Sequence, residues 1–319
     1  MELRTAETSV ESVRAFEPIP KELDPVKMPN SSLREYGLPE RPDPDKQPRE
    51  YARWLRHAKA QRIVPDLVKT NVQHGPLLQR PTDSPETSQN WSGIVIVDPA
   101  NPFAQHTRIY ADFTVPNILP PAPAPQTYCS AWVGIDGYGS GDVLQAGVQI
   151  VDNGGNIQAY FWTEWYPENE VQVTNLAVKP GDSVGIVLTF DNPGGGGAVL
   201  TNNTSNQSVG FSISPPAGVA LTGNCIEWIV ERPGINGQYS TLAPYGSVVM
   251  QNCDANGGAD LIYWPGQAPT GTIDTFTMIN TNGQTISQAS LGPPDQYNGK
   301  EEYDNIVFVY NINYEPTTT

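Results

Sequence analysis

Histidine and cysteine, the residues that most often bind metals or act as nucleophiles, are scarce in this chain. The 319 residues include three histidines and three cysteines, and only His106 among the histidines lies beyond residue 89. A zinc site built on two or three histidines is therefore not expected there. Cys129, Cys225 and Cys253 allow at most one internal disulfide and leave one thiol over. The spacing of the cysteines shows neither which two of them would form a disulfide nor whether the protein resides in an oxidising or a reducing compartment.

Several common catalytic motifs are also missing. The sequence contains no glycine-rich phosphate loop of the Walker type. Asp136-Gly137 occurs without the Asp-Thr/Ser-Gly pair of aspartic peptidases. Cys129 and His106 would allow a cysteine-protease pair on paper, but nothing in the sequence marks them. Carboxylates and side-chain amides remain as the candidate catalytic groups, and we expect no metal and no cofactor.

Basic residues are nearly absent from the larger part of the chain. Residues 1–88 hold fourteen Lys/Arg and fourteen Asp/Glu, whereas residues 89–319 hold four and twenty, so the net charge of −16 lies in the second part. Such a surface repels nucleic acid, which needs Lys and Arg to contact its phosphates. In acid the carboxylates are neutralised and their repulsion falls, which suits a protein that works at low pH. A merely soluble acidic domain would have the same composition.

Long apolar runs are missing as well. No run approaches the roughly 18–20 residues of a membrane helix, so we expect no membrane association. The N-terminal sequence MELRTAETSVESV lacks the apolar region of a secretory signal. Either the chain is not exported or its signal has been removed. We also expect the protein to be a monomer.

The N-terminal part has the character of an extension. Residues 1–45 are rich in proline and charge without a sustained hydrophobic period, which predicts an extended, partly disordered leader. Residues 45–64 have apolar side chains near helical spacing and six basic against two acidic residues, which predicts a basic helix with a net charge of +4. Residues 64–89 have the character of a linker. We therefore divide the chain into an extension, residues 1–88, and a domain, residues 89–319.

From Asn90 onward the sequence has the pattern of β-strands. Runs of β-branched and aromatic residues alternate with turns rich in Gly, Pro, Asn and Asp, and no convincing helix is interposed. This pattern predicts an all-β fold, an antiparallel β-sandwich. The expected strands are residues 93–97, 107–113, 130–135, 143–150, 157–165, 184–190, 209–213, 226–231, 260–263, 272–278 and 305–314.

Two of these strands carry unusual polar residues. In residues 143–150, alternation places Gln145 and Gln149 on one face together with a glycine, which allows something to approach closely. From the pattern alone this face would be exposed to solvent. A later strand places Glu227 and Glu231 together on one face, opposite apolar residues.

Five short motifs occur in a characteristic order: Asn90-Trp91-Ser92-Gly93, Trp132-Val133-Gly134-Ile135-Asp136-Gly137, Gln145-Ala146-Gly147, Glu164-Trp165-Tyr166-Pro167 and Glu227-Trp228-Ile229-Val230-Glu231. With this series, the chain from about Ser88 to near the C-terminus resembles the glutamic peptidases (eqolisins), acid-acting endopeptidases that use a glutamate and a glutamine. The resemblance implies two large curved antiparallel sheets of the lectin-like, jelly-roll type, packed face to face, with the active residues on a concave face. It also implies protein or peptide substrates, secretion and an N-terminal propeptide.

The resemblance also assigns roles to individual residues. Glu227 takes the place of the catalytic glutamate and Gln145 that of the catalytic glutamine. The family tends to have an aspartate four residues after its glutamine, where this chain has Gln149. If that acid tunes the glutamate, the pH optimum of this protein is expected to differ. Further candidates for substrate binding or for support of the catalytic pair are Asp136, Glu164, Trp132 and Trp165.

The chemistry of the two catalytic candidates fits work in acid. An unperturbed glutamate titrates near pH 4.3, so Glu227 would be a competent base at about pH 3–5 without a large pKa shift. A tetrahedral intermediate needs a hydrogen-bond donor for its oxyanion, and a side-chain amide is one. In the roles that the resemblance implies, Glu227 activates a water and later protonates the leaving amine, while Gln145 stabilises the oxyanion. Neither role requires a metal or a covalent intermediate.

The charge asymmetry suggests a function for the basic helix. Beside an acidic domain it would occupy the active-site cleft at neutral pH and be released when carboxylates become protonated. The same charges are equally typical of a solvated amphipathic helix that packs elsewhere.

Two other functions fit the same strand pattern. A lectin-like sandwich would bind carbohydrate through Trp and Tyr, or hydrolyse it with two carboxylates such as Glu164 and Glu227. A glycosidase would depend on Glu164, whereas peptidolysis needs the amide of Gln145. A catalytically inactive binding module is the third interpretation, against which stands the presence of both matched catalytic residues.

Overall fold

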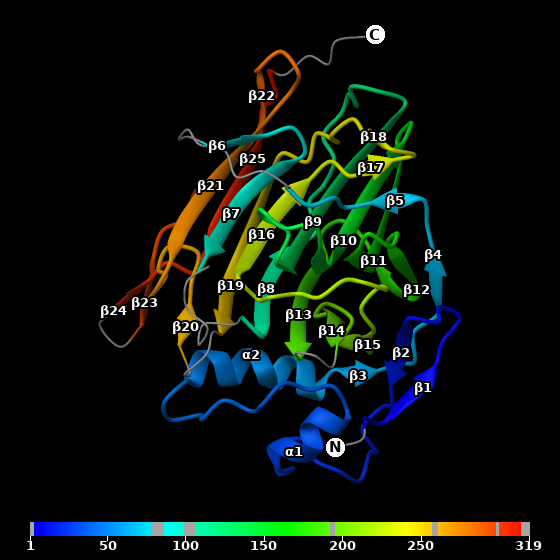
Figure 1. The fold of residues 1–319 in the computed structure, drawn as a ribbon, viewed down its shortest axis with the longest axis vertical. Coiled ribbons are helices and arrows are strands. Elements are labelled where there is room, and N and C mark those ends of the chain that lie inside the picture. The colour runs from blue at the N-terminus through cyan, green and yellow to red at the C-terminus, as the bar shows by residue number, and fades with distance from the viewer. Residues whose placement is uncertain are drawn as a thin grey trace.

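The computed structural model describes residues 3–77, 86–98, 106–191, 195–256, 261–297 and 300–313. A first layer of antiparallel strands consists of β7 Trp91–Val97, β9 Gln126–Ile135, β10 Val143–Asn153, β11 Asn156–Tyr166, β12 Val171–Val178, β16 Cys225–Glu231 and β21 Thr272–Ile279. Within it the strand order is β12, β11, β10, β9, β16, β7, β21 (Figure 1). The order is antiparallel throughout, as the turn-rich sequence predicts.

The pairing continues from β21 into a second layer. Its strands are β8 Arg108–Thr114, β13 Ser183–Asp191, β14 Gly195–Asn202, β15 Gln207–Ile213, β19 Ser247–Asn256, β22 Thr285–Leu291 and β25 Ile306–Tyr310. From β21 the order is β22, β25, β19, β8, β13, β14, β15. Strands β8, β13 and β14 lie against β9 and β10 of the first layer. The predicted β-sandwich is therefore confirmed.

The main hydrophobic core lies between the two layers. Alternation sends Leu144 and Val148 of β10 inward, where they join Phe113, Ile186 and Phe211 from the second layer in one buried cluster. Each such side chain contributes roughly 1.5–3 kcal/mol when fully buried. This packing fixes the register of β10, because a shift by one residue would exchange its two faces.

The other face of the first layer, which we call the site face, is also buried. Three rows of residues cross it at right angles to the strands. The middle row is aromatic, with Trp162, Trp132 and Phe276 in a second hydrophobic cluster. The two flanking rows carry the polar residues, among them Gln145 and Glu227, both fully buried. The expectation of a solvent-exposed face is wrong, since the N-terminal part of the chain covers it.

The described part of the N-terminal extension, residues 3–77 and 86–88, forms strands and helices, contrary to the prediction of a leader and a linker on either side of the basic helix. It contains β1 Thr5–Glu7, β2 Val13–Phe16, α1 Asn30–Glu35, α2 Pro48–Lys59, β3 Gln61–Arg62, β4 Leu67–Lys69, β5 Val72–Gln73 and β6 Glu86–Ser88. Strands β2 and β3 pair with β15, β4 pairs with β12, and β6 pairs with β21. These strands are two to four residues long, too short to give a periodic signal in the sequence.

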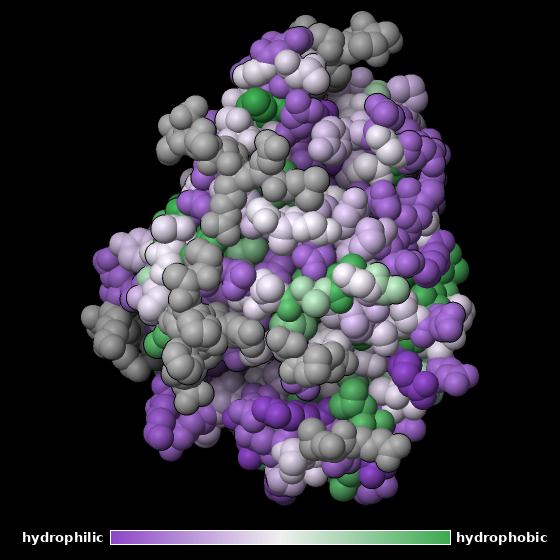
Figure 2. Space-filling view, in the orientation of Figure 1, coloured by the Kyte–Doolittle hydropathy of each residue, from purple (hydrophilic) through white to green (hydrophobic). Residues whose placement is uncertain are grey.

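The basic helix forms, but it does not lie on the site face. Helix α2 crosses the lower end of the molecule, a region of strongly hydrophilic surface (Figures 1 and 2). There Arg53 forms an ion pair with Asp254, and Arg49 lies 2.5 Å from Glu302 and 3.0 Å from Asp304. The attraction between a basic helix and an acidic domain is therefore present. The hypothesis that this helix fills the cleft is wrong, because its arginines bind carboxylates at the end of the sandwich.

The predicted strand positions are mostly confirmed, with ends that differ by a few residues. The sequence did not indicate β12, β14, β19 or β22, whose glycines, asparagines and exposed polar residues obscure the alternation. Two short pairs complete the fold: β17 Gly234–Ile235 with β18 Gln238–Tyr239, and β23 Asp295–Tyr297 with β24 Lys300–Glu302. Of the strand expected at 260–263, β20 Ile262–Tyr263 is observed. Asp260 and Tyr314, the ends of two predicted strands, lie outside the described residues.

The three cysteines are buried and form no disulfide in the described structure. Burial raises the pKa of the Cys129 and Cys253 thiols, which makes them poor nucleophiles. Over the part of the chain that the structure describes, no helix combines the length and apolarity that crossing a membrane would require.

Candidate active site

Strand register brings the two predicted catalytic residues to either side of one glycine. Gln145 on β10 and Glu227 on β16 both lie opposite Gly134 of β9. Their backbones are two strand spacings apart, about 10 Å, so their side chains can lean toward each other over the glycine. A Cβ atom at Gly134 would lie only 2.6 Å from Glu227 Oε1. The glycine is what leaves room for the pair.

The Glu227 carboxyl is fully buried, and no N–H or O–H group of the described residues donates to either of its oxygens; the Cys225 thiol interacts with it. Burial raises the pKa of Glu227 well above its usual range, the negative charge of Asp136 adds to the rise, and the Cys225 thiol opposes it. The sequence predicted a base that needs no large pKa shift. In this structure burial instead shifts the carboxyl toward its protonated form.

Asp136 positions Glu227 from a distance. It follows β9 in a left-handed turn, with φ of 63°. Its carboxylate accepts hydrogen bonds from the backbone N–H groups of Thr222, Gly223 and Asn224, at 2.6, 2.9 and 2.8 Å. These residues lead directly into β16. Asp136 therefore fixes the start of the strand that carries Glu227, which agrees with its predicted supporting role.

The side-chain amide nitrogen of Gln145 donates two hydrogen bonds. Nε2 donates to the backbone carbonyl of His74 at 2.6 Å and to Glu164 Oε1 at 3.0 Å. Glu164 sits opposite Gln145 on β11, and its two carboxyl oxygens accept the backbone N–H of His74 at 3.1 Å. Glu164 thus orients the Gln145 amide, again as a supporting residue. Burial raises the pKa of Glu164 well above its usual range.

The side chain of His74 fills a buried pocket next to this pair. Its Nδ1 lies 2.9 Å from Glu231 Oε2 and its Nε2 lies 3.0 Å from Glu170 Oε2. The imidazole stacks on Trp162 with the ring centroids 3.7 Å apart and the planes at 6°. Burial opposes protonation, but the attraction of Glu231 and the bonds to both carboxylates outweigh it and raise the pKa of His74 to about 10. The imidazole is therefore a cation between two carboxylates.

His74 belongs to a stretch of the extension that crosses the site face, residues 72–77, which we call the covering segment. It begins as β5, which pairs with β17 and passes in front of β9 and β10 in Figure 1. At its other end Leu77 exchanges hydrogen bonds with Gly137 and Gly139, at 2.8 and 2.7 Å. Gly137 adjoins Glu227, so the segment extends from the glutamine to the glutamate.

The two predicted tryptophans, Trp132 and Trp165, lie on opposite faces of the first layer. Trp132 lies in the middle row of the site face, where its indole donates to Glu231 at 2.9 Å. It packs over Gly147, at which a Cβ would lie 2.5 Å from Trp132 Cβ, so the close approach inferred for that glycine is to this tryptophan. Trp165 points to the opposite face and belongs to the main core. The prediction that Trp165 serves the site is therefore not supported by its position.

Gln149 lies in a different row from the catalytic candidates. Register places it beside Ser130 and Glu231, one row beyond the aromatic residues. Its amide donates to the backbone carbonyls of Cys129 and Ile150 at 3.2 and 2.8 Å. In this position it secures the strand backbone and makes no contact with Glu227.

The sequence did not reveal two residues of the site, His74 and Glu170. His74 stands before Gly-Pro in a stretch without periodicity, and Glu170 lies in the turn between β11 and β12. Neither position has a local signal, because only the folded chain brings them together.

The geometry gives less support to three other kinds of site: a glycosidase pair of carboxyl groups, a metal site and a serine nucleophile. The Glu164 carboxyl accepts hydrogen bonds from the Gln145 amide at 3.0 Å and from the backbone N–H of His74 at 3.1 Å, so its contacts are those of a residue that orients the glutamine and not those of the second acid of a glycosidase. No group of His, Cys, Asp and Glu in the described ranges has the arrangement of a metal site. Gly181-Asp182-Ser183-Val184-Gly185 has the spacing of a serine nucleophile elbow, but that motif needs a strand-to-helix turn. Here Ser183 opens strand β13 and is exposed.

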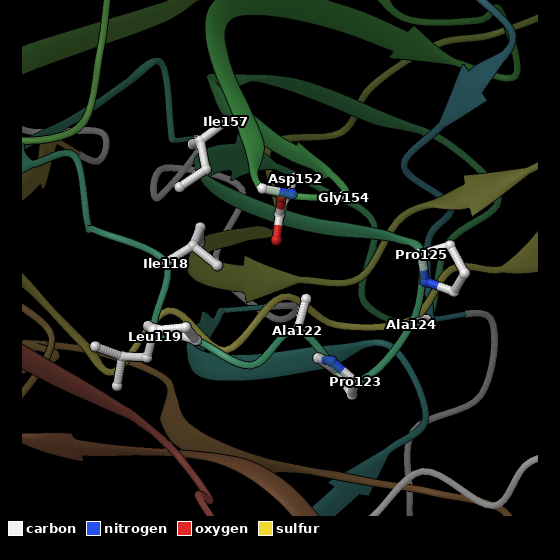
Figure 3. Close-up of a pocket in the computed structure, with 11 residues that line it drawn as sticks. Ile118, Leu119, Ala122, Pro123, Ala124, Pro125, Asp152, Gly154 and Ile157 are labelled. Atoms are coloured by element: carbon white, nitrogen blue, oxygen red, sulfur yellow. The ribbon is translucent and has the colours of Figure 1, made fainter.

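Two pockets were found near the surface of the described structure. A groove of about 650 Å³ is formed by a proline-rich loop, with Ile118 and Pro125, and by the turn after β10, with Asp152 (Figure 3). The Asp152 carboxylate that lines this groove accepts a hydrogen bond from the backbone N–H of Gly155 at 2.7 Å, so it stabilises the turn. A second pocket of about 540 Å³ reaches Glu164 from the side of residues 213–217. Only the second pocket touches the candidate site.

Comparison with known proteins agrees with this geometry and places the chain in a class, the glutamic peptidases. Residues 89–298 match the Peptidase A4 family, so the chain belongs to this family of eqolisin-type hydrolases. Aspergillopepsin-2 of Aspergillus niger is 27% identical over 229 residues, which cover 66% of this chain and 77% of that protein. Scytalidopepsin B of Scytalidium lignicola is 28% identical over 212 residues, which cover 63% of this chain and 74% of that protein.

A solved structure shares the fold. Scytalido-glutamic peptidase with a transition state analog inhibitor superposes with a TM-score of 0.58 at 21% identity, over 70% of this chain and 99% of that one.

Proposed function

We propose that Glu227 and Gln145 together hydrolyse peptide bonds in acid by direct attack of water. Glu227 takes a proton from a water molecule, whose oxygen attacks the carbonyl carbon of the substrate. Gln145 Nε2 donates a hydrogen bond to the oxyanion of the tetrahedral intermediate. The protonated Glu227 then gives its proton to the nitrogen as the C–N bond breaks, which yields a carboxylic acid and an amine.

One observation carries this proposal. Gln145 Nε2 already donates to a peptide carbonyl, that of His74, at 2.6 Å, while the buried Glu227 carboxyl, to which no N–H or O–H group of the described residues donates, lies on the other side of Gly134. A peptide carbonyl held by an amide beside a candidate base is the arrangement that acyl transfer requires. The peptide ligand named for the related scytalido-glutamic peptidase also fits a peptide substrate here.

We further propose that residues 1–88 are an inhibitory propeptide and that the enzyme acts outside the cell. The covering segment holds Gln145 through a carbonyl and closes over the face that carries Glu227. A carboxyl whose pKa is raised by burial stays protonated and cannot accept a proton from water. Inhibition would thus come from the covering segment, with helix α2 as its anchor at the end of the sandwich.

The test is cleavage of casein by the full chain at pH 2–7, with and without EDTA and pepstatin. We expect cleavage in acid that neither compound inhibits, and a loss of about 10²–10³-fold in kcat for Gln145→Ala. His74→Ala, which removes the imidazole from its pocket, should give activity without prior incubation in acid. If neither protein cleaves casein at any pH, the proposal fails, and binding to carbohydrate arrays becomes the next measurement.

A further inference from the structure

The covering segment shows how a peptide lies on the site face, and it identifies one side chain of that peptide. If Gln145 binds the carbonyl of the bond to be cleaved, then His74 stands in the position of the residue that supplies this carbonyl, the P1 residue. The surroundings of the His74 imidazole are then the pocket for the P1 side chain. This step rests on the proposed function, because it takes its reference point from the role of Gln145.

The pocket is built for a planar cation. Glu231 and Glu170 face the two ring nitrogens, at 2.9 and 3.0 Å, and Trp162 lies flat beneath the ring. Hydrogen bonds between ionised groups are stronger than neutral ones, and an aromatic face attracts a cation. A neutral aliphatic side chain in the same place would deprive both buried carboxylates of the donor and the positive charge that the imidazole supplies.

The walls of the pocket are held in place by residues outside the covering segment. Glu231 accepts from Trp132 Nε1 at 2.9 Å and from Asn90 Nδ2 at 3.0 Å. Glu170 accepts from the hydroxyl of Tyr160 at 3.1 Å. All three donors belong to the sandwich. Glu170 also accepts from Thr70 Oγ1 of the extension at 3.1 Å, so when the extension leaves Glu231 keeps both of these donors and Glu170 keeps Tyr160. A third acid, Glu164, faces the backbone of the bound residue and does not face its ring.

We propose that Glu170, Glu231 and Trp162 form a P1 subsite that selects peptides with a protonated histidine before the cleaved bond. Such a substrate would take over the contacts that His74 makes in the uncleaved chain. The subsite determines specificity and takes no part in proton transfer.

The test compares three quenched-fluorescence peptides that differ only in the P1 residue: His, Phe or Gln. The enzyme is the full chain after incubation in acid, assayed at pH 5, where a free imidazole is charged. We expect kcat/KM for the His peptide to exceed that for the other two by about tenfold or more, as for a hydrogen bond between charged groups. Mass spectrometry of the products locates the cleaved bond.

Substitutions of the subsite residues distinguish a role in substrate recognition from a role in stabilising the fold. Glu231→Gln or Glu170→Gln should lower kcat/KM for the His peptide about tenfold or more relative to kcat/KM for the Gln peptide. Glu168→Gln is the matched control, since Glu168 is half exposed and pairs with Lys69 at the surface. A loss that is equal for all three peptides would show a structural role and overturn the proposal.

A binding measurement does not depend on the variants. The peptide VQHGPL, which has the sequence of the covering segment, should inhibit casein cleavage at least about tenfold more strongly than VQLGPL. Equal inhibition by the two peptides, or equal cleavage of the three substrates, would refute the subsite while casein cleavage continues. Absence of casein cleavage would instead refute the proposed function, and the subsite with it.

Discussion

At the scale of single residues, the site depends on a glycine as much as on its acid and amide. Gly134 lies between Gln145 and Glu227 in register, and the space above it lets these two side chains of β10 and β16 approach each other across β9. A methyl group at this position would contact both the Glu227 carboxyl at 2.6 Å and the Trp132 ring at 2.8 Å. Both are confined by the packed site face.

We therefore predict that Gly134→Ala abolishes most activity. Displacement of a catalytic group by about 1 Å can cost about 10²-fold in rate, so a loss of at least that size is expected in kcat. Casein cleavage at pH 4 measures it, and circular dichroism checks that the fold is kept. Gly141→Ala is the control, because a Cβ there meets no atom within 4 Å. Equal activity of the two variants would contradict the role given to Gly134.

Gln145, Glu227, Asp136 and Glu164 could be selected from the sequence because they stand in short motifs that resemble those of the glutamic peptidases. The twofold period of a strand placed Gln145 with Gln149 and Glu227 with Glu231. The same reasoning failed for Trp165, whose neighbour Glu164 takes the site face and so sends the tryptophan into the main core. His74 was out of reach, since its contacts are with residues about 70 to 160 positions away.

At the scale of elements, helix α2 is attached to the sandwich through charge. Arg53 is almost completely buried and pairs with Asp254 and Glu50, while its guanidinium lies 5.5 Å from the centre of the Tyr110 ring. The helix pattern and the basic charge were both visible in the sequence. The docking site was not, because its carboxylates come from strands far along the chain, such as β19.

We predict that Arg53→Ala loosens the extension. Removal of one partner from a buried ion pair typically costs about 3–5 kcal/mol, and we expect a smaller loss here because Asp254 keeps its ion pair with Arg108 at 2.8 Å. Hydrogen exchange at neutral pH should show faster exchange over α2, and urea unfolding should show lower stability. Arg34→Ala provides the comparison, since the pair of Arg34 with Glu40 is more than half exposed and is worth less than about 1 kcal/mol. Equal effects of the two substitutions would contradict this account.

At the scale of the whole molecule, the buried acids make stability depend on pH. The pKa values of Glu227 and Glu164 are raised by burial, so the folded protein binds more protons than the unfolded chain above about pH 4.5. Their contribution to stability is fully present in acid and is lost as the pH rises through the folded pKa values. His57 on α2 acts in the opposite direction, because burial lowers its pKa to about 4 and its contribution is lost as the pH falls from 6.5.

Comparison with a neutral variant isolates the contribution of Glu227. Glu227→Gln cannot titrate, so we predict that the wild-type melting temperature falls relative to that of the variant as the pH rises from 4.5 to 8. Calorimetry of both proteins at each pH gives the difference, in which the opposing effect of His57 cancels. A difference that does not change with pH would show that Glu227 has an ordinary pKa in the folded chain.

The central claim is that Glu227 activates the attacking water, and kcat for Glu227→Gln tests it most directly. The measurement uses peptide cleavage at pH 4 in the His74→Ala background, so that access to the site does not depend on self-cleavage, with Glu168→Gln beside it. We predict a loss of at least about a hundredfold for Glu227→Gln, because the amide cannot accept a proton from water, and no loss for Glu168→Gln. A Glu227→Gln protein with the kcat of its parent would contradict the account.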